Sequence, residues 1–70
     1  MKYAVVIEAG RKSFGAYVPD LPGCIAVAKT RAEVIQLIQE AIEWHLQSLQ
    51  EQGDDVPQPA SSVEFVHVAA

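Results

Sequence analysis

Cysteine and long apolar runs are both scarce in this chain. Its one cysteine, Cys24, excludes a disulfide within the chain and fits a reducing compartment. No apolar run approaches the roughly 18 residues that a membrane-spanning helix needs. Met1 leads directly into a strand-like segment rather than a signal peptide, so we expect a cytoplasmic protein with no membrane association.

Positive charge is equally sparse. Five lysine and arginine residues stand against nine acidic residues, which gives the chain a formal net charge of −4. The five cations are scattered, whereas nucleic-acid binding needs clustered cations that neutralise phosphates. We therefore expect no direct binding of nucleic acid, and an acidic chain suits a basic protein partner better.

Apolar side chains, by contrast, are abundant, at 50% of 70 residues. This length makes residues 1–70 a single domain, and a domain so small buries only about 60% of the surface that its unfolded chain exposes. The surplus of apolar residues has to be covered by another chain. We therefore expect a homo-oligomer, either a dimer or a tetramer.

Hydrophobic patterning divides the chain into four strands and one helix. Residues 1–8, 14–18 and 24–28 have the composition of strands. Thr30 and Glu33 have the spacing of a capping box, and Gly53 suits a left-handed C-cap, so the helix should run from Arg31 to about Gln52. Its apolar residues fall on one broad face, with glutamine and glutamate opposite. A loop over residues 54–62 and a final strand over residues 63–68 complete the prediction.

The element order β-β-β-α-β predicts an α+β fold. Three strands linked by short connections should be antiparallel neighbours, and the helix then makes a right-handed crossover that returns the last strand parallel to the first. The expected architecture is a four-stranded mixed sheet of order 3-2-1-4 with one helix on one face. Because the strands carry apolar residues on both faces, the uncovered face or an edge strand should meet another chain.

The most informative short segment is residues 19–24. Pro19 and Pro22 fix φ and remove two backbone donors, so no central strand can pass through them. Gly23 after Pro22 suits a type II turn, and Asp20 can accept hydrogen bonds from nearby backbone. Residue chemistry alone therefore predicts a rigid loop between two strands.

No constellation in the sequence indicates catalysis. Glu8, Asp20 and Glu64 could approach one another near the sheet ends, as carboxylates do in ribonuclease H-like metal sites, but their spacing specifies no shared site. The histidines and the cysteine lack the spacing of zinc ligands. We therefore expect no enzymatic activity, no metal site and no cofactor.

Two neighbouring helix residues are candidates for a binding surface. His45 lies within the apolar arc of the helix, where a packed or edge residue is the commoner interpretation. Trp44 can anchor an interface, and it suits the edge of a core equally well.

The combination of elements and residues resembles the HicB-like antitoxin domain over about residues 2–68. The resemblance is carried by the strands, by the run Pro-Asp-Leu-Pro-Gly-Cys at 19–24, by Thr-Arg-Ala-Glu at 30–33 and by Glu-Ala-Ile at 40–42. It implies a partial ribonuclease H-like fold and the neutralisation of HicA, a small basic RNA-cleaving toxin. Many members also carry a C-terminal DNA-binding segment, and we expect no such domain here.

We therefore predict a non-catalytic antitoxin module that binds and neutralises a small basic HicA-like toxin. The alternative is an orphan module of the same fold that self-associates or binds a small ligand. A metal-dependent nuclease ranks far behind both. The predicted contacts are the exposed sheet face and the turn residues Asp20, Leu21, Pro22, Gly23 and Cys24, followed by Trp44 and His45.

Overall fold

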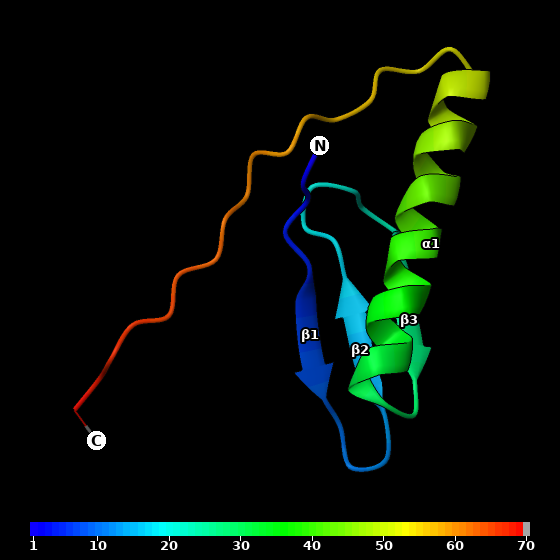
Figure 1. Cartoon of the computed structure of the whole chain (residues 1–70). Helices are drawn as coiled ribbons and strands as arrows, with labels where there is room; N and C mark the ends of the chain where they lie inside the picture. Colours follow the sequence, from blue (N-terminus) through cyan, green and yellow to red (C-terminus); the bar gives the residue numbers. More distant parts are fainter. Residues whose placement is uncertain (70) are drawn as a thin grey trace.

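The computed structural model describes residues 1–69, in which three strands precede one helix (Figure 1). The elements are β1 (Val6–Ala9), β2 (Phe14–Tyr17), β3 (Ile25–Ala28) and α1 (Arg31–Glu51). The strands pair antiparallel in the order β1-β2-β3, and α1 lies across one face of the sheet, mainly over β3 and β2. The α+β class, the three antiparallel strands and the single covering helix are therefore confirmed.

The register of the sheet decides which side chains meet the helix. Ile7, Ala16 and Ala26 lie opposite one another on the three strands, so they share the face that α1 covers. The alanines let the helix approach the sheet closely, and Ala16 is buried. The opposite face carries Tyr17 and Ile25, which stay exposed.

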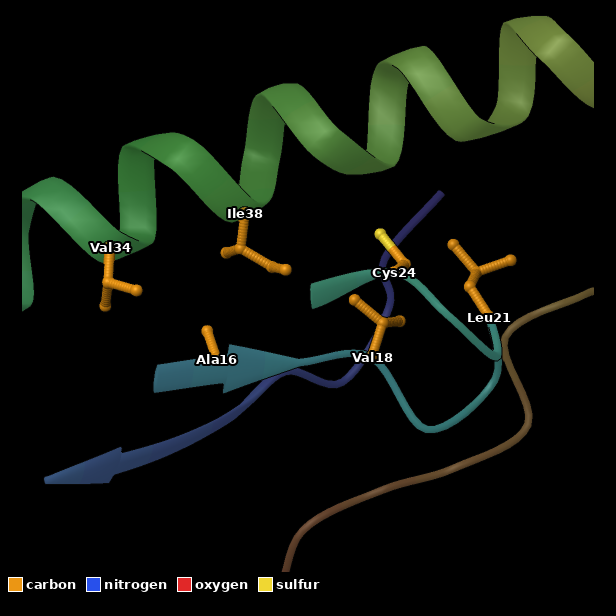
Figure 2. Close-up of a cluster of buried hydrophobic side chains, with 6 residues drawn as sticks. All are labelled: Ala16, Val18, Leu21, Cys24, Val34 and Ile38. Carbon is orange, nitrogen blue, oxygen red and sulfur yellow. The ribbon is translucent and has the colours of Figure 1, made fainter. Parts of the chain in front are cut away.

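The core between sheet and helix is small, with six buried apolar side chains drawn in Figure 2. They are Ala16, Val18, Leu21, Cys24, Val34 and Ile38. Leu21 and Val34 are the largest side chains with no exposed surface. The two come from the turn after β2 and from the first turns of α1, so the turn is part of the core rather than an appendage to it.

The turn at residues 19–24 has the predicted backbone chemistry. The N–H of Cys24 donates to the carbonyl of Leu21 at 3.1 Å, which closes a four-residue turn with Gly23 at its third position. Gly23 has φ of 86°, the positive value that a type II turn requires there. The prediction of a rigid turn with a conformational role for this glycine is confirmed.

Both ends of α1 also follow the sequence. Thr30 Oγ1 accepts from the backbone N–H of Glu33 at 3.1 Å, while its hydroxyl donates to Glu33 Oε1 at 2.9 Å. At the other end Gly53 has φ of 74°, and the N–H of Asp54 donates to the carbonyl of Leu49 at 2.9 Å. This is a Schellman arrangement, which satisfies carbonyls that the last turn leaves free.

The predicted fourth strand is wrong for a single chain. Within residues 1–69 the sheet has three strands in the order 1-2-3, so neither the mixed four-stranded sheet nor the order 3-2-1-4 is observed. Residues 63–68 are extended and run outward on the β1 side of the domain (Figure 1). The first strand is also shorter than predicted, since it begins at Val6 rather than at residue 1.

An electrostatic clamp at Asp20 explains where the last segment leaves the domain. The Asp20 carboxylate accepts from the backbone N–H groups of Ala60 at 3.0 Å and Ser61 at 2.9 Å, and from the Ser61 hydroxyl at 2.9 Å. Nearby, the Tyr3 hydroxyl donates to the carbonyl of Pro57. Only Ser62 separates the clamp from residue 63, and beyond it the chain diverges from β1 instead of pairing with it (Figure 1). The strand propensity of residues 63–68 is therefore not sufficient to pair them with β1 of the same chain.

Replacing the buried Leu21 tests the role of the turn in the core. We expect Leu21→Ala to lower the free energy of unfolding by about 2–5 kcal/mol, because it leaves a cavity under α1. Leu37→Ala is the matched control, since Leu37 is 42% exposed on the helix, and its cost should be distinctly smaller. Urea denaturation followed by circular dichroism measures both. Equal losses for the two variants would contradict a core that depends on the turn.

The clamp should release in acid. The pKa of Asp20 lies below its usual 3.8, because the backbone N–H groups of Ser61 and Ala60 and the Ser61 hydroxyl all donate to the carboxylate. A lowered pKa means that the stabilisation is complete above pH 3.8 and is lost as the pH falls through the lowered value. The NMR amide shifts of Ala60 and Ser61 should therefore titrate with a midpoint below 3.8.

A matched pair of variants completes the measurement. Asp20→Asn should abolish this titration, whereas Asp54→Asn makes the same chemical change just after the helix and should leave it in place. A midpoint at or above 3.8 in the unmodified chain would show that the three donors do not hold the carboxylate.

Candidate partner-binding surfaces

The turn at residues 19–24 presents little of itself to a partner. Leu21 and Cys24 are buried in the core, and burial raises the pKa of the Cys24 thiol. Figure 2 shows both side chains on the core side of the turn, beneath α1. Pro22 and Gly23 are exposed at the tip. A partner that contacts this turn would therefore meet a rigid tip rather than the whole run.

Asp20, the other residue predicted at this turn, is already occupied. Its carboxylate holds Ala60 and Ser61, so its charge is directed at the chain itself. The sequence predicted that Asp20 accepts backbone hydrogen bonds, but it placed the donors next in the chain rather than 40 residues away. The role of the turn residues in partner binding stays a prediction.

Trp44 is a highly accessible predicted contact residue. Its side chain is 78% exposed, and with Gln47, Ser48 and Glu51 it lines a shallow depression of about 140 Å³ on α1. His45, the next residue, is half-buried on the other side of the helix. The two neighbours therefore belong to different surfaces, because successive residues are about 100° apart around a helix.

An acidic face surrounds Trp44. Glu40 and Glu51 lie four and seven residues from Trp44, on the same side of α1, and Glu43 borders this side because it lies three residues after Glu40. All three carboxylates are exposed. Gln36 and Gln47 donate to Glu40 and Glu51, respectively, at 3.2 Å, which orders these carboxylates along the helix. We call Glu40, Glu43, Trp44 and Glu51 the acidic helix face.

The charge of the chain changes sign near the start of α1. Residues 1–31 contain all five cations and two acidic residues, whereas residues 32–70 contain seven acidic residues and no lysine or arginine. The formal charges of the two parts are thus +3 and −7, which sum to −4. This division was missed in the sequence analysis, although counting charges on either side of Arg31 would have revealed it.

The carboxyl end of α1 lies wholly in the acidic part. A helix carries partial negative charge at its carboxyl end, where cations stabilise it and anions do not. The last turn has no basic residue, and Glu51, Asp54 and Asp55 cluster there instead. Four-residue strands span only about 13 Å, while a helix of 21 residues is about 31 Å long. The acidic end of α1 therefore projects beyond the sheet (Figure 1).

The uncovered face of the sheet is the second open surface. Tyr17, Ile25 and Val27 are 40%, 67% and 66% exposed on the side away from α1. The sequence predicted that one face would stay uncovered and apolar, and it does. Its use as an interface stays a prediction.

The carboxylates considered for a nuclease are not brought together. Within residues 1–69 no three side chains of histidine, cysteine, aspartate or glutamate lie close enough to hold a metal ion. Glu8 lies near the end of β1, next to the β1–β2 connection, and Glu64 lies in the extended segment 63–68. The carboxylate of Asp20 already accepts hydrogen bonds from Ala60 and Ser61. In this part of the chain, too, no helix has the length and apolarity to cross a membrane.

Known proteins with similar sequences match between two thirds and nearly all of the chain. A UPF0150 protein of Thermoplasma acidophilum is 34% identical over 68 residues, which are 96% of this chain and 99% of the relative. A UPF0150 protein of Archaeoglobus fulgidus is 42% identical over 48 residues, or 67% of this chain and 70% of the relative. An uncharacterized 14.9 kDa protein of Haemophilus phage HP1 is 27% identical over 67 residues, and the chain spans half of its length.

A solved structure shares the fold. One chain of the HicA3 and HicB3 toxin-antitoxin complex matches with a TM-score of 0.72 and 28% sequence identity, covering 86% of this chain and 70% of that one. The family model described as the HicB-like antitoxin of bacterial toxin-antitoxin systems matches residues 3–69. Since that match includes the strands, the turn, the helix and the outgoing segment, this chain belongs to the HicB-like antitoxin family.

Proposed function

We propose that this chain is a non-catalytic antitoxin that binds and neutralises a small basic RNA-cleaving toxin of the HicA type. Family membership and the similarity to a chain of a HicA–HicB complex support a toxin as the partner class. The single observation that carries the proposal is the acidic helix face, because it offers a basic protein both charge and an aromatic anchor. A cytoplasmic location is part of the proposal.

The acidic helix face has the properties of an interface rather than of a merely solvated helix. Trp44 is 78% exposed, and tryptophan is among the residues that most often dominate binding energies when a partner buries them. Around it stand carboxylates without a nearby cation on the helix, since α1 carries no lysine or arginine after Arg31. A basic partner would supply the positive charge that the carboxyl end of α1 lacks.

Neutralisation of a toxin by this surface requires binding alone and no catalysed reaction. A toxin that cleaves RNA has to attract phosphates with positive charge. An acidic face that covers those charges competes with RNA directly and acts stoichiometrically. Because exposed charge pairs are screened by salt, the complex should weaken as ionic strength rises.

Two features belong to the periphery of this proposal. His45 is half-buried on a different side of α1 from Trp44, and the exposed tip of the turn, Pro22 and Gly23, is a further candidate contact. The uncovered sheet face with Tyr17 is the competing position for the toxin. Variants at Trp44 and Tyr17 distinguish binding at the acidic helix face from binding at the sheet face.

The proposal is tested with the protein encoded next to this chain, co-expressed and then titrated by calorimetry. We expect a small basic protein to co-purify, and Trp44→Ala to weaken binding by about 30-fold, the loss of about 2 kcal/mol typical of a hot spot. Tyr17→Ala is the matched aromatic truncation on the sheet face and should have little effect. The opposite ranking would move the toxin to the sheet face, and no complex with a small basic neighbour would refute the toxin partnership.

Charge reversal at Glu51 separates binding from folding. Glu51→Lys places a cation at the carboxyl end of α1, so it should stabilise the isolated chain by about 0.3–1 kcal/mol. The same substitution should weaken toxin binding, because it places a positive charge in the acidic helix face. Glu8→Lys makes the identical change on β1 and should leave the affinity nearly unchanged. Loss of stability in Glu51→Lys would contradict the dipole argument, and unchanged affinity would contradict the docking surface.

The runner-up is an orphan module of the same fold that has no toxin. The exposed apolar residues Tyr17, Ile25 and Val27 favour self-association as its activity. Under this alternative no neighbouring protein co-purifies, while self-association persists.

A further inference from the structure

The segment after the Asp20 clamp exposes four large apolar side chains. We call residues 63–68 the C-terminal arm. Its Phe65 is 92% exposed, Val66 73%, Val68 80% and Val63 55%. Within the described residues, no hydrogen bond found for this structure reaches beyond Ser61 to the arm. Several large apolar side chains exposed within one short segment are characteristic of an interaction site rather than of a solvated tail.

The arm has the sequence of a strand that lacks a partner. Valine and phenylalanine favour extended backbone, and the order Val-Glu-Phe-Val-His-Val places apolar groups on both sides of a strand. Such two-sided patterning is typical of a strand that is buried on both faces. An isolated strand leaves its apolar side chains in water, whereas a sheet edge offers them apolar contact together with backbone hydrogen bonds.

The domain has an edge with matching properties. Among residues 1–69, β1 pairs only with β2, which leaves its other edge free. Beside this edge an apolar groove of about 250 Å³ lies between β1 and α1, lined by Val5, Ile7, Ile35, Ile38, Gln39 and Ile42. The groove exists because α1 sits over β3 and β2 and leaves β1 largely uncovered. A strand added at β1 would place every second side chain in this groove.

The arm of the same chain is directed away from that edge. Asp20 fixes Ala60 and Ser61, and only Ser62 follows before the arm begins. The arm then diverges from β1 (Figure 1), and the molecule extends over 48 Å with a radius of gyration of 13.8 Å. A compact domain of this length has a radius of about 11 Å, so the single chain is expanded.

A second copy of the chain can provide both an edge for the arm and an arm for the free edge of β1. Each copy carries one unpaired arm and one unpaired β1 edge, so two copies related by a twofold axis can pair both arms with both β1 edges in one closed dimer. Apart from the carboxylate of Glu64, the arm contributes nothing to the formal charge of the chain. This composition suits an apolar groove better than it suits a basic protein. The acidic charge that fits a toxin lies on α1 instead.

We propose that two copies of this chain exchange their C-terminal arms. Residues 63–68 of each copy add as a fourth strand to the free edge of β1 in the other copy, with alternate apolar side chains in the groove between β1 and α1. The dimer thus completes a four-stranded sheet that one chain alone leaves at three strands.

The first test is the mass of the full chain in solution, measured by sedimentation equilibrium. We expect twice the chain mass of 7.6 kDa. Phe65→Asp should yield a monomer with its helix intact by circular dichroism, because the exposed Phe65 contributes nothing to the core of its own chain. Ser62→Asp adds the same charge next to the arm and should remain dimeric. A wild-type monomer at the highest attainable concentration would overturn the proposal.

The second test identifies the contact on the unmodified protein, so it does not depend on a variant that folds. In a dimer mixed from isotope-labelled and unlabelled chains, isotope-filtered NMR should show the Phe65 ring or the Val66 methyls next to Ile7 and Ile42 of the other chain. Arm contacts found only within one chain, or a dimer whose arms show no such contacts, would refute the exchange.

The outcome is separate from that of the toxin proposal. Phe65→Asp leaves the acidic helix face intact, so its monomer should bind a basic toxin with unchanged affinity, whereas Trp44→Ala should weaken that binding. If the Phe65 signals shift only when the toxin is added, the arm belongs to the toxin interface and the exchange between copies is wrong.

Discussion

The burial of Leu21 beneath α1 is the contact on which the rest of the structure depends. Leu21 is one of the two largest side chains with no exposed surface, and it lies on the turn that joins β2 to β3. Its neighbour Asp20 holds Ala60 and Ser61. Two adjacent residues of one rigid turn thus fix the helix on the sheet and the point at which the last segment leaves it. In a core of six buried residues, few other contacts could replace this one.

Charge organises the surface as strongly as apolar packing organises the core. The lysines and arginines are confined to residues 1–31, and the formally charged side chains of residues 32–70 are all acidic. Glu51, Asp54 and Asp55 stand where the helix dipole is already negative, so the chain itself does not balance them. A protein selected for stability alone would place cations there. The imbalance is explained if another molecule supplies them, which connects the electrostatics of α1 to a basic partner.

Local chemistry was readable from the sequence, and long-range pairing was not. The capping box at Thr30, the positive φ at Gly23 and Gly53 and the course of α1 each depend on residues close in the chain, and each was predicted correctly. The fourth strand was predicted from composition and crossover rules, yet pairing depends on where the chain leaves the domain. That exit is set by a contact between Asp20 and Ser61, 41 residues apart, which no local pattern reveals.

The predicted contact residues differ in whether the structure exposes them. Trp44 was identified as a possible anchor because aromatic residues concentrate at interfaces, and its exposure makes it available. Leu21 and Cys24 were predicted as partner contacts because the sequence of the turn is specific. The structure shows that both residues pack in the core. The residues most specific to a family pattern are then those that build the domain, whereas the contact surface is drawn from exposed positions around them.

The two proposed partners make different demands on the chain, and the structure keeps those demands apart. A toxin that is held by charge needs an accessible acidic face, which α1 provides on the side turned away from the sheet. A second copy that is held by apolar contact needs a free edge and an arm, and both lie on the β1 side (Figure 1). Two chains of formal charge −4 repel each other in general, but the arm contributes only Glu64 to that charge. Exchange through the arm thus joins the copies where repulsion is weakest and leaves both acidic faces free for a basic protein.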